Sequence, residues 1–510
     1  MSDVSTSSYT LSPTNRRVFI GLLLGMLVSS ISQTIVGPAM PRIVAELGGM
    51  DHYSWLATSA MLVSAITVPI VGKLSDMYGR RRFYLGGLIV FMLGSALSGA
   101  APSFGFLIFA RSIQGLGMGC LIPLSQTIIG DIIPPRHRGK FQGYMGAVFG
   151  VTSVVGPIAG GAITDHIGWR WLFYITLPLG IIALIVIARF LHVDETRRKA
   201  KVDVAGMATM TVALMCLLLA TSLGGTTYPW ASAQIIGLFA VGVLMLGVFL
   251  FIETRAAEPV LPLRLFTKSV VALCCLAAFG VNMLMFGATI YIPVFAQGVL
   301  GVSATSSGAI LVPMSAAMIL TSIAIGLLIS KTGTYKAITL LGVLVMAGGI
   351  VALTLLDETS APLHLTGAMI IFGLGLGACM QVYTLLVQNA VRRTDLGVAT
   401  AATQFFRNVG ATVGIAVFGT IMTSRMAVTI PAHLPPGAEQ HMGASAGEGV
   451  GNVLDPAALA NIPPAIAGAV RAGLSEAITT VFIAALPVAL IVLIATALIA
   501  NNPLRDAHEN

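Results

Sequence analysis

Apolar stretches of about 20 residues recur along the whole chain, and only short polar turns separate most of them. A helix needs about that length to cross the hydrocarbon layer of a bilayer. Barrels built from strands are excluded, because membrane strands alternate apolar and polar residues. The sequence therefore predicts an all-α polytopic membrane protein with fourteen spans, at residues 17–38, 54–74, 83–101, 105–127, 139–162, 169–190, 205–224, 232–252, 270–297, 306–330, 337–356, 365–389, 397–421 and 474–499.

The distribution of charge predicts the orientation of the chain. Only 9% of the 510 residues are charged, whereas soluble proteins carry roughly a quarter. With a cytoplasmic amino terminus, the outer segments hold few basic residues, namely Arg42, Arg170, Arg425 and Arg471. Because cytoplasmic loops collect Lys and Arg, the net charge of +8 reflects topology and predicts no nucleic-acid partner. We expect a bacterial inner (cytoplasmic) membrane, with both termini cytoplasmic.

Glycines reveal an internal repeat. The run Gly115–Gly119 recurs as Gly373–Gly377, at an offset of 258 residues. A second set of landmarks recurs at an offset of 254 residues, with Gly72 and Gly79 matched by Gly326 and Gly333. The second span therefore corresponds to the tenth, and the fourth to the twelfth. This register predicts two parallel six-helix halves with two helices inserted between them.

The repeat also sets the expected domain boundaries. We assign residues 1–15 and 501–510 to cytoplasmic tails, 16–192 to the first half, 193–254 to the inserted helices and 255–500 to the second half. Residues 424–473 contain Pro431, Pro435 and Pro436 and a Gly/Ala/Ser-rich run, which argue against a helix. We expect a long outer loop there, and we favour a connector over a gate for the substrate.

The turn between the second and third spans, Gly72–Arg82, is basic and carries an acid. Asp76 ends one helix, Arg80 begins the next, and Asp131 at the inner end of the fourth span is the expected third partner. Such a cluster can latch helices in one conformation and release them in another. Charges that only set topology would explain the arginines but not Asp76 or the glycines Gly72 and Gly79.

Two features inside the spans are candidates for a mechanism. Arg111 lies within the fourth span, where a guanidinium is costly unless it faces the bundle interior. It either takes part in proton coupling or in holding the central cavity together, or it simply bonds backbone carbonyls or neighbouring side chains. The fifth span carries Gly150, Gly156, Pro157, Gly160 and Gly161. Small residues allow close helix approach and proline bends a helix, so these residues form either a hinge or a packing surface.

Several of these motifs resemble those of the major facilitator superfamily. Gly72–Arg82 is similar to its cytoplasmic signature loop, 107–115 to its second motif, and 146–161 to the motif of its antiporters. Three further segments resemble the fourteen-span drug:proton antiporter branch, at 169–180, 258–266 and 405–410. The resemblance implies a transporter, not an enzyme, that needs no cofactor. It further implies export of amphipathic small molecules of the multidrug type by alternating access, coupled to proton antiport.

One position departs from that branch. Many members carry an aspartate before a Thr-Ile-Val run in the first span, and here that place holds Ser32. We find no acid at mid-depth in the other expected spans, where the deep ionisable groups are Arg111 and Arg407. Proton coupling then requires an acid near a helix end or a different relay. Two buried arginines also favour an anionic, zwitterionic or neutral substrate over a dication.

We expect the substrate cavity between spans one, four, nine, twelve and thirteen. Its candidate lining is polar, aromatic or flexible, and comprises Gln33, Thr34, Gln126, Asn282, Met285, Phe286, Tyr291, Gln297, Gln381, Tyr383, Gln388, Gln404, Arg407 and Asn408. For any single one of them, helix–helix hydrogen bonding is the alternative role.

Other functions fit the sequence less well. An ATP-driven pump needs a phosphate-binding loop, and the Gly72-Lys73 pair lacks the required upstream glycine. The cysteines show no spacing typical of a metal site. The main alternative is an exporter or flippase of an endogenous lipid or secondary metabolite without classical proton coupling, followed by a receptor derived from a transporter. The expected partners are the substrate, protons and membrane lipids, and we expect a functional monomer.

Overall fold

The computed structural model describes residues 11–48, 55–191, 202–225, 228–302, 304–434 and 464–501. Within these ranges fourteen helices are long and apolar enough to cross a membrane. The same ranges contain one isolated β-bridge, between Gly224 and Tyr228, and no strand. These findings confirm the all-α polytopic fold.

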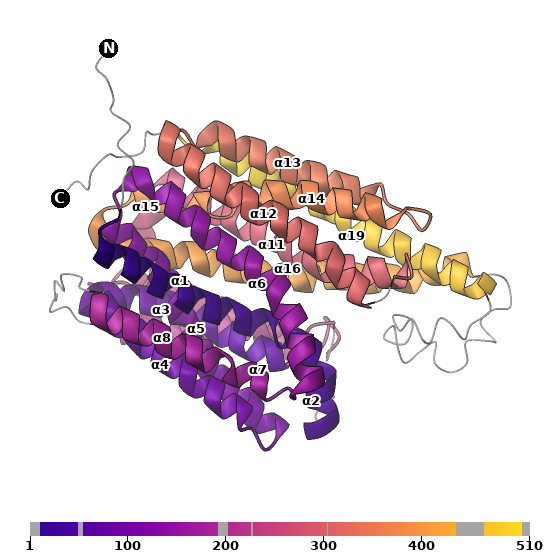
Figure 1. Cartoon of the computed structure of the whole chain (residues 1–510), viewed down its shortest axis with the longest axis horizontal. Helices are drawn as coiled ribbons and strands as arrows, with labels where there is room; N and C mark the ends of the chain where they lie inside the picture. Colours follow the sequence, from indigo (N-terminus) through magenta and orange to yellow (C-terminus); the bar gives the residue numbers. More distant parts are fainter. Residues whose placement is uncertain are drawn as a thin grey trace, which may run out of the picture.

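The helices form two bundles with an inserted pair between them in the chain (Figure 1). The first bundle contains α1 (Pro13–Thr34), α2 (Met40–Leu47), α3 (Trp55–Tyr78), α4 (Arg80–Gly99), α5 (Phe104–Ile132), α6 (Arg138–His166), α7 (Trp171–Tyr174) and α8 (Thr176–Phe190). The inserted pair is α9 (Val204–Leu223) and α10 (Ala233–Glu253). The second bundle contains α11 (Ser269–Gly298), α12 (Ala304–Thr332), α13 (Lys336–Thr354), α14 (Pro362–Cys379), α15 (Val382–Ala390), α16 (Leu396–His433) and α19 (Pro464–Leu498).

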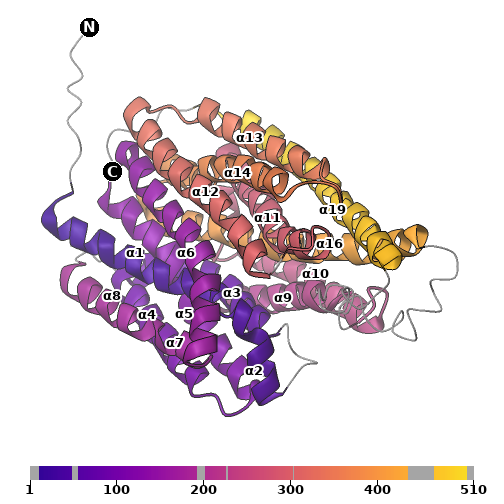
Figure 2. The same ribbon diagram turned by 45° about the vertical axis from the view of Figure 1, so that its right-hand side comes forward.

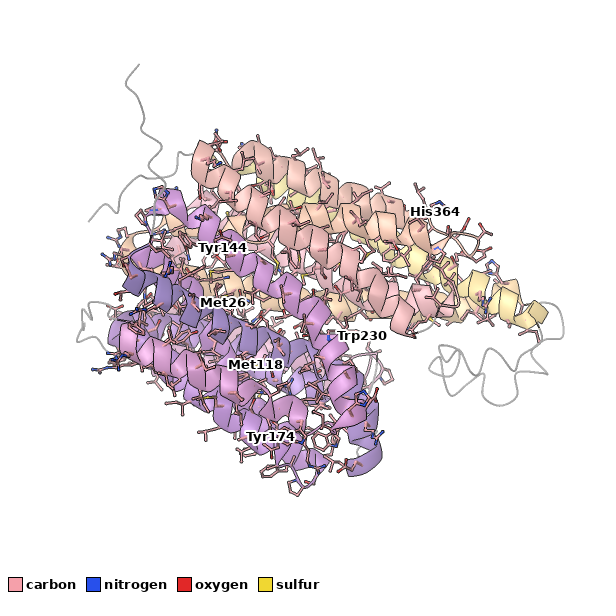
Figure 3. The ribbon with its side chains drawn as sticks, in the orientation of Figure 1. Met26, Met118, Tyr144, Tyr174, Trp230 and His364 are labelled. Atoms are coloured by element: carbon pink, nitrogen blue, oxygen red, sulfur yellow. The ribbon has the colours of Figure 1, made fainter. Side chains whose placement is uncertain are left out.

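The two bundles approach each other at one end of the molecule and diverge toward the other (Figure 1). We call the end where α3 ends and α16 begins the converging end. The opposite end, where α6 ends and α14 begins, is the diverging end. In Figure 3, Tyr174 and His364 mark the diverging ends of the first and second bundles.

The packing of glycines confirms the internal repeat. A Cβ atom added at Gly115 would lie 2.5 Å from the carbonyl oxygen of Ala60, so α5 rests directly on the backbone of α3. A Cβ atom added at Gly373 would lie 2.3 Å from the carbonyl oxygen of Met314, which brings α14 equally close to α12. Ala60 and Met314 are 254 residues apart, so the contacts repeat with both offsets found in the sequence.

The halves meet through two seams at the converging end, and glycine makes both possible. A Cβ atom added at Gly72 of α3 would lie 2.3 Å from the Cβ of Ala401 in α16. In the other seam, a Cβ atom added at Gly326 of α12 would lie 2.4 Å from the carbonyl oxygen of Gly139 in α6. Gly72 and Gly326 are equivalent in the repeat, so each half contributes the same element to the partner half.

The inserted helices α9 and α10 pack on each other and cover only one seam (Figure 2). Helix α9 contacts both α3 and α16. Met210, Leu214 and Leu218 of α9 belong to the same buried cluster as Leu62 and Ile66 of α3. The α3–α16 seam is therefore backed by additional apolar packing on its outer surface.

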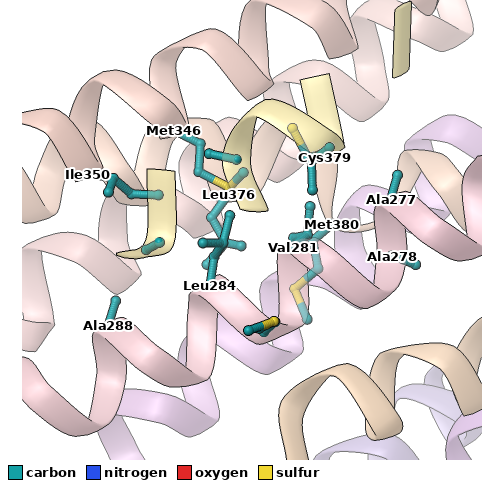
Figure 4. Packing of buried hydrophobic residues seen from close by; sticks show 14 of the residues in the cluster. Ala277, Ala278, Val281, Leu284, Ala288, Met346, Ile350, Leu376, Cys379 and Met380 are labelled. Atoms are coloured by element: carbon teal, nitrogen blue, oxygen red, sulfur yellow. The ribbon is translucent and has the colours of Figure 1, made fainter. Parts of the chain in front are cut away.

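Interdigitated apolar side chains hold the second bundle together. Ala277, Val281 and Leu284 form one stripe of α11 at helical spacing, Leu376 of α14 lies beside Leu284, and Met346 of α13 lies next to Leu376 (Figure 4). These side chains are buried, and removing apolar surface of this size from a core typically costs 2–5 kcal/mol.

The structure differs from the expected boundaries in two places. Helix α16 continues to His433 and α19 begins at Pro464, so the outer loop expected at 424–473 is shorter; residues 435–463 lie outside the described ranges. In the extra turns the Thr429 hydroxyl donates to the Gly473 carbonyl at 2.7 Å, which joins the end of α16 to α19. The span expected at 365–389 is broken between α14 and α15, at Met380 and Gln381.

Adding one methyl group at the seam should destabilise this conformation. In Gly326→Ala the new Cβ would meet backbone atoms of α6, which cannot move aside as a flexible side chain can. We expect the melting temperature in detergent to fall by several degrees. Gly348→Ala is the matched control, because Gly348 is exposed on α13 with no heavy atom within 4 Å of an added Cβ. Equal melting of the two variants would contradict the close seam.

Candidate functional site

A buried charge cluster lies at the converging end of the first half. Gly79 has φ +102°, a conformation that suits glycine, and this turn brings Arg80 back toward α3. Arg80 Nη2 donates to Asp76 Oδ1 at 2.8 Å, and Arg80 Nη1 pairs with Asp131 Oδ2. All three side chains are at most 9% exposed. The structure therefore brings together the three charges that the sequence placed in one cluster.

Asp76 also reaches across to the second half. The backbone N–H of Val398, in the first turn of α16, donates to Asp76 Oδ2 at 3.0 Å. A carboxylate is stabilised at a helix amino terminus, where unpaired N–H groups and the helix dipole favour negative charge. Asp76 thus links Arg80 in its own half to α16 in the other. The sequence pattern does not predict this contact, although Gly139 and Gly397 also recur at the offset of 258 residues and mark the starts of α6 and α16 as equivalent.

Two further ion pairs surround the cluster. Lys73 Nζ lies 2.6 Å from Glu258 Oε2, which ties α3 to the segment between α10 and α11. Arg393 Nε, from the second half, lies 3.8 Å from Asp131 Oδ1. Because Arg393 is about half exposed, that pair contributes little by itself. The converging end is therefore held mainly by buried contacts.

Glutamine side chains form a second contact between the halves. Gln126 Nε2 donates to Gln381 Oε1 at 3.4 Å, and Gln142 Nε2 donates to Gln388 Oε1 at 3.4 Å. Gln388 Nε2 in turn donates to the Gln126 carbonyl at 3.0 Å and to the Thr400 hydroxyl at 3.2 Å. All five side chains are buried. Amide groups hydrogen-bond to water as readily as to each other, so these contacts can exchange for bonds to water at little cost.

The space beside these glutamines is too small for a substrate. A cavity lined by Gln142, Gln381, Ser322 and Gly143 has a volume of about 10 Å³, roughly what one water molecule needs. Arg138 closes the seam further, since Nε donates to the Ile133 carbonyl at 2.9 Å and Nη1 to the Gln388 carbonyl at 3.5 Å. In this conformation the converging end is sealed against a drug-sized molecule.

Arg111 is held by groups of its own half. Its guanidinium donates to the carbonyl of Leu56 at 3.2 Å, to the hydroxyl of Ser32 at 3.2 Å and to Gln114 Oε1. It also lies 5.9 Å from the ring centroid of Phe173. These contacts join α5 to α1 and α3. The geometry is that of a structural clamp, and a part in proton coupling remains a prediction. Ser32, which stands where many members of the drug:proton antiporter branch carry an aspartate, accepts one of these bonds from Arg111.

Arg407 is the opposite case. It is 2% exposed, and none of Nε, Nη1 and Nη2 has a hydrogen-bond partner among the residues that the structure describes. Nearby on α16, Gln404 Nε2 donates to Asn408 Oδ1 at 3.2 Å, and Gln404 Oε1 is unpaired. The two deep arginines predicted from the sequence therefore differ in kind: Arg111 donates through Nε and Nη1, whereas Arg407 has no hydrogen-bond partner among the described residues.

The candidate hinge residues of α6 fall into two groups. Before Pro157 the helix follows α12: a Cβ atom at Gly150 would lie 2.3 Å from Ile319 Cγ1. From Gly156 onward it follows α1, since a Cβ atom at Gly160 would lie 2.3 Å from the Ile35 carbonyl oxygen. Gly161 has no such neighbour within 4 Å. Helix α6 thus changes partner from the other half to its own near Pro157, and a hinge there remains a prediction.

The other candidate cavity residues are scattered. Thr34 donates to the Thr152 carbonyl at 3.0 Å, Asn282 to the Ala278 carbonyl at 3.0 Å, and Tyr291 to the Ile415 carbonyl at 3.5 Å. Each of these bonds lies within one half. Tyr383 lies 2.8 Å from the Thr496 hydroxyl of α19, inside the second bundle. The remaining candidates, Gln33, Met285, Phe286 and Gln297, are half-buried.

Comparison with known proteins identifies the family of this chain. A family model described as "Major Facilitator Superfamily" matches residues 22–415. Multidrug transporter protein MdtP of Bacillus subtilis (strain 168) is 45% identical over 405 residues, covering 79% of this chain and 75% of its own. Multidrug resistance protein 3 of the same organism is 39% identical over 476 residues, 92% of each chain. The crystal structure of the human organic anion transporter MFSD10 (TETRAN) is similar in fold, with TM-score 0.62 and 14% identity, covering 94% of this chain and 100% of that one.

Neutralising Asp76 should weaken the seal. Asp76→Asn keeps the shape of the side chain but loses the charge that favours both Arg80 and the α16 amino terminus, at a cost of about 1 kcal/mol. We expect a cysteine introduced in Gln142→Cys to react about fivefold faster with a water-soluble maleimide, since 1 kcal/mol corresponds to about that factor. Asp357→Asn, an equal charge change on an exposed loop, serves as the control. Unchanged reactivity in Asp76→Asn would contradict the latch.

Proposed function

The chain belongs to the major facilitator superfamily, and on that premise we propose that it exports amphipathic small molecules by alternating access. The contact between Asp76 and Val398 carries this proposal, because it joins the two halves through a carboxylate charge at the α3–α16 seam. A contact that depends on one charge and one helix terminus can break and reform. Separation at the converging end with closure at the diverging end would expose a central site to each side in turn.

The distribution of charge supports the direction of the cycle. Lys73, Arg80 and Arg138 lie at the converging end, and positively charged segments are retained on the cytoplasmic side. We therefore assign the converging end to the cytoplasm of an inner membrane, with both termini inside. On this assignment the described conformation is closed to the cytoplasm and faces outward, which is the state that follows release of an exported substrate.

Proton antiport is the proposed energy source. Asp76 and Asp131 are the two acids of the charge cluster with Arg80. Loss of either charge would weaken the contacts that close the cytoplasmic side. Ser32 cannot serve as a carrier, because a hydroxyl does not ionise at physiological pH. The proposal therefore assigns the coupling to the charges that also hold the halves together. The α6 glycines and Pro157 would supply the bend.

A second candidate function rests on the same geometry. An exporter or flippase of a lipid or secondary metabolite would use the same latch without a proton carrier at mid-depth. Ser32 favours this alternative, because it removes the aspartate on which the related antiporters of the branch rely. The two functions differ in whether a pH gradient drives movement of the substrate.

Transport in proteoliposomes separates the two candidates. We expect an imposed pH gradient to accelerate export of members of a panel of cationic, neutral and anionic amphiphiles at least tenfold over protein-free liposomes. Asp76→Asn and Asp131→Asn should each reduce that acceleration, whereas Asp357→Asn should not. Export that ignores the gradient would refute proton coupling and favour the flippase. Absence of export for the whole panel would refute the multidrug function.

A further inference from the structure

Arg407 is a deeply buried cation without any partner in the described structure. Its guanidinium carries five N–H donors in a planar fork, and all three nitrogens lack acceptors. A charge buried in this way is costly, and proteins normally pair it or bond it to carbonyls. Arg111, equally buried, shows the ordinary solution, with bonds to Leu56, Ser32 and Gln114. In contrast to Arg111, Arg407 needs an acceptor that the described residues do not supply.

The position of Arg407 suits contact with a transported molecule. It lies eleven residues after Leu396, the first residue of α16 at the converging end. At 1.5 Å per residue this is about 16 Å along the helix, close to half of the roughly 30 Å hydrocarbon layer. The repeated halves of such transporters enclose their site at this depth.

Arg407 also shares a helix face with Thr400, which is one hydrogen bond away from the contact between the halves. Thr400 lies seven residues earlier, nearly two turns, and so projects from the same side of α16. The Thr400 hydroxyl accepts from Gln388, which bonds to the Gln126 carbonyl of the first half. Gln404, one turn from Thr400, has an unpaired Oε1. Polar groups therefore line this face from the sealed cluster toward Arg407.

The described residues provide no counter-ion at that depth. Asp76 meets α16 at Val398, nine residues before Arg407, or about 14 Å along the axis. Asp131 lies with Arg80 and Arg393 at the same converging end. A negative group that reaches Arg407 must consequently come from outside the described protein.

We propose that Arg407 binds the oxyanion of the exported amphiphile, a carboxylate, sulfonate or phosphate. The guanidinium fork matches two oxygens of such a group, and bidentate pairs of this kind are short and strong. This assignment rests on the proposed export function and names the substrate class of its site. Because Arg407 is 2% exposed, the anion reaches it only when α16 separates from its neighbours during the cycle.

Stability gives the first test, without any ligand. Arg407→Met removes an unpaired charge and leaves no partner unsatisfied, so its melting temperature in detergent should equal or exceed that of the wild-type protein. Arg111→Met is the contrasting variant, because it leaves the acceptors of Gln114 and Leu56 unpaired, and it should melt several degrees lower. A large fall for Arg407→Met would show that Arg407 is structural and would overturn the proposal.

Three probes with one aromatic body give the second test: 1-pyrenesulfonate, pyrenemethanol and trimethyl(pyrenylmethyl)ammonium. In Arg407→Met we expect binding and export of pyrenesulfonate to fall at least tenfold, with pyrenemethanol within twofold of wild type. Arg407→Lys should retain part of the pyrenesulfonate binding, because it keeps the charge but not the fork. Arg425→Met, which removes an exposed charge from the same helix, should match wild type for all three probes.

The outcomes separate failure of the site from failure of the function. Equal loss of all three probes in Arg407→Met, or unchanged pyrenesulfonate binding, would overturn the role of Arg407 while export itself stands. In a third outcome, the wild-type protein binds pyrenesulfonate but never exports it, and lysophosphatidate displaces the bound probe. This result would assign Arg407 to a lipid headgroup and overturn its role with the substrate. Wild-type protein that exports none of the probes would refute the multidrug function, and the detergent binding assay would still decide the role of Arg407.

Discussion

The hydrogen bond between the Asp76 carboxylate and the first turn of α16 is the interaction on which this conformation depends. It forms only because Gly72 allows α3 to touch α16 and because the turn at Gly79 brings Arg80 back to the same carboxylate. Asp131 completes the cluster by pairing with Arg80. Arg80 bonds both carboxylates, so losing either one weakens the cluster, and the sequence of one short turn is thereby linked to the contact between the halves.

The two seams are equivalent by repeat but not by chemistry. The α3–α16 seam carries the charge cluster and is covered by the inserted helix α9. The α6–α12 seam contains closely packed glycines and uncharged hydroxyl groups. Gly326 lies against Gly139, and the hydroxyls of Ser153 and Ser315 are 2.8 Å apart. An ionic seam responds to protonation and a packed seam does not. On the proposed cycle, this asymmetry would place control on the α3–α16 side of the molecule, with the α6–α12 side as the pivot.

The sequence predicted the fold well and the cavity poorly, for one physical reason. Helix number, the repeat and the Asp76–Arg80–Asp131 cluster depend on local pattern or on residues beside a short turn. The rotation of each helix about its own axis cannot be predicted from such patterns, because spans such as α1 are apolar all round. Tyr383 consequently packs on Thr496 and Asn282 bonds its own helix, while Gln142 and Thr400, which do lie at the contact between the halves, were not predicted.

Distances between spin labels across the halves test the central claim of alternating access most directly. One pair, Arg189→Cys with Thr334→Cys, spans the converging end, and a second, Ile167→Cys with Leu363→Cys, spans the diverging end; all four positions are exposed. In the wild-type background we expect a dominant short distance between the two labels at the converging end. Asp76→Asn should lengthen that distance and shorten the one at the diverging end. Distances at both ends that stay unchanged, or that change in the same direction, would contradict it.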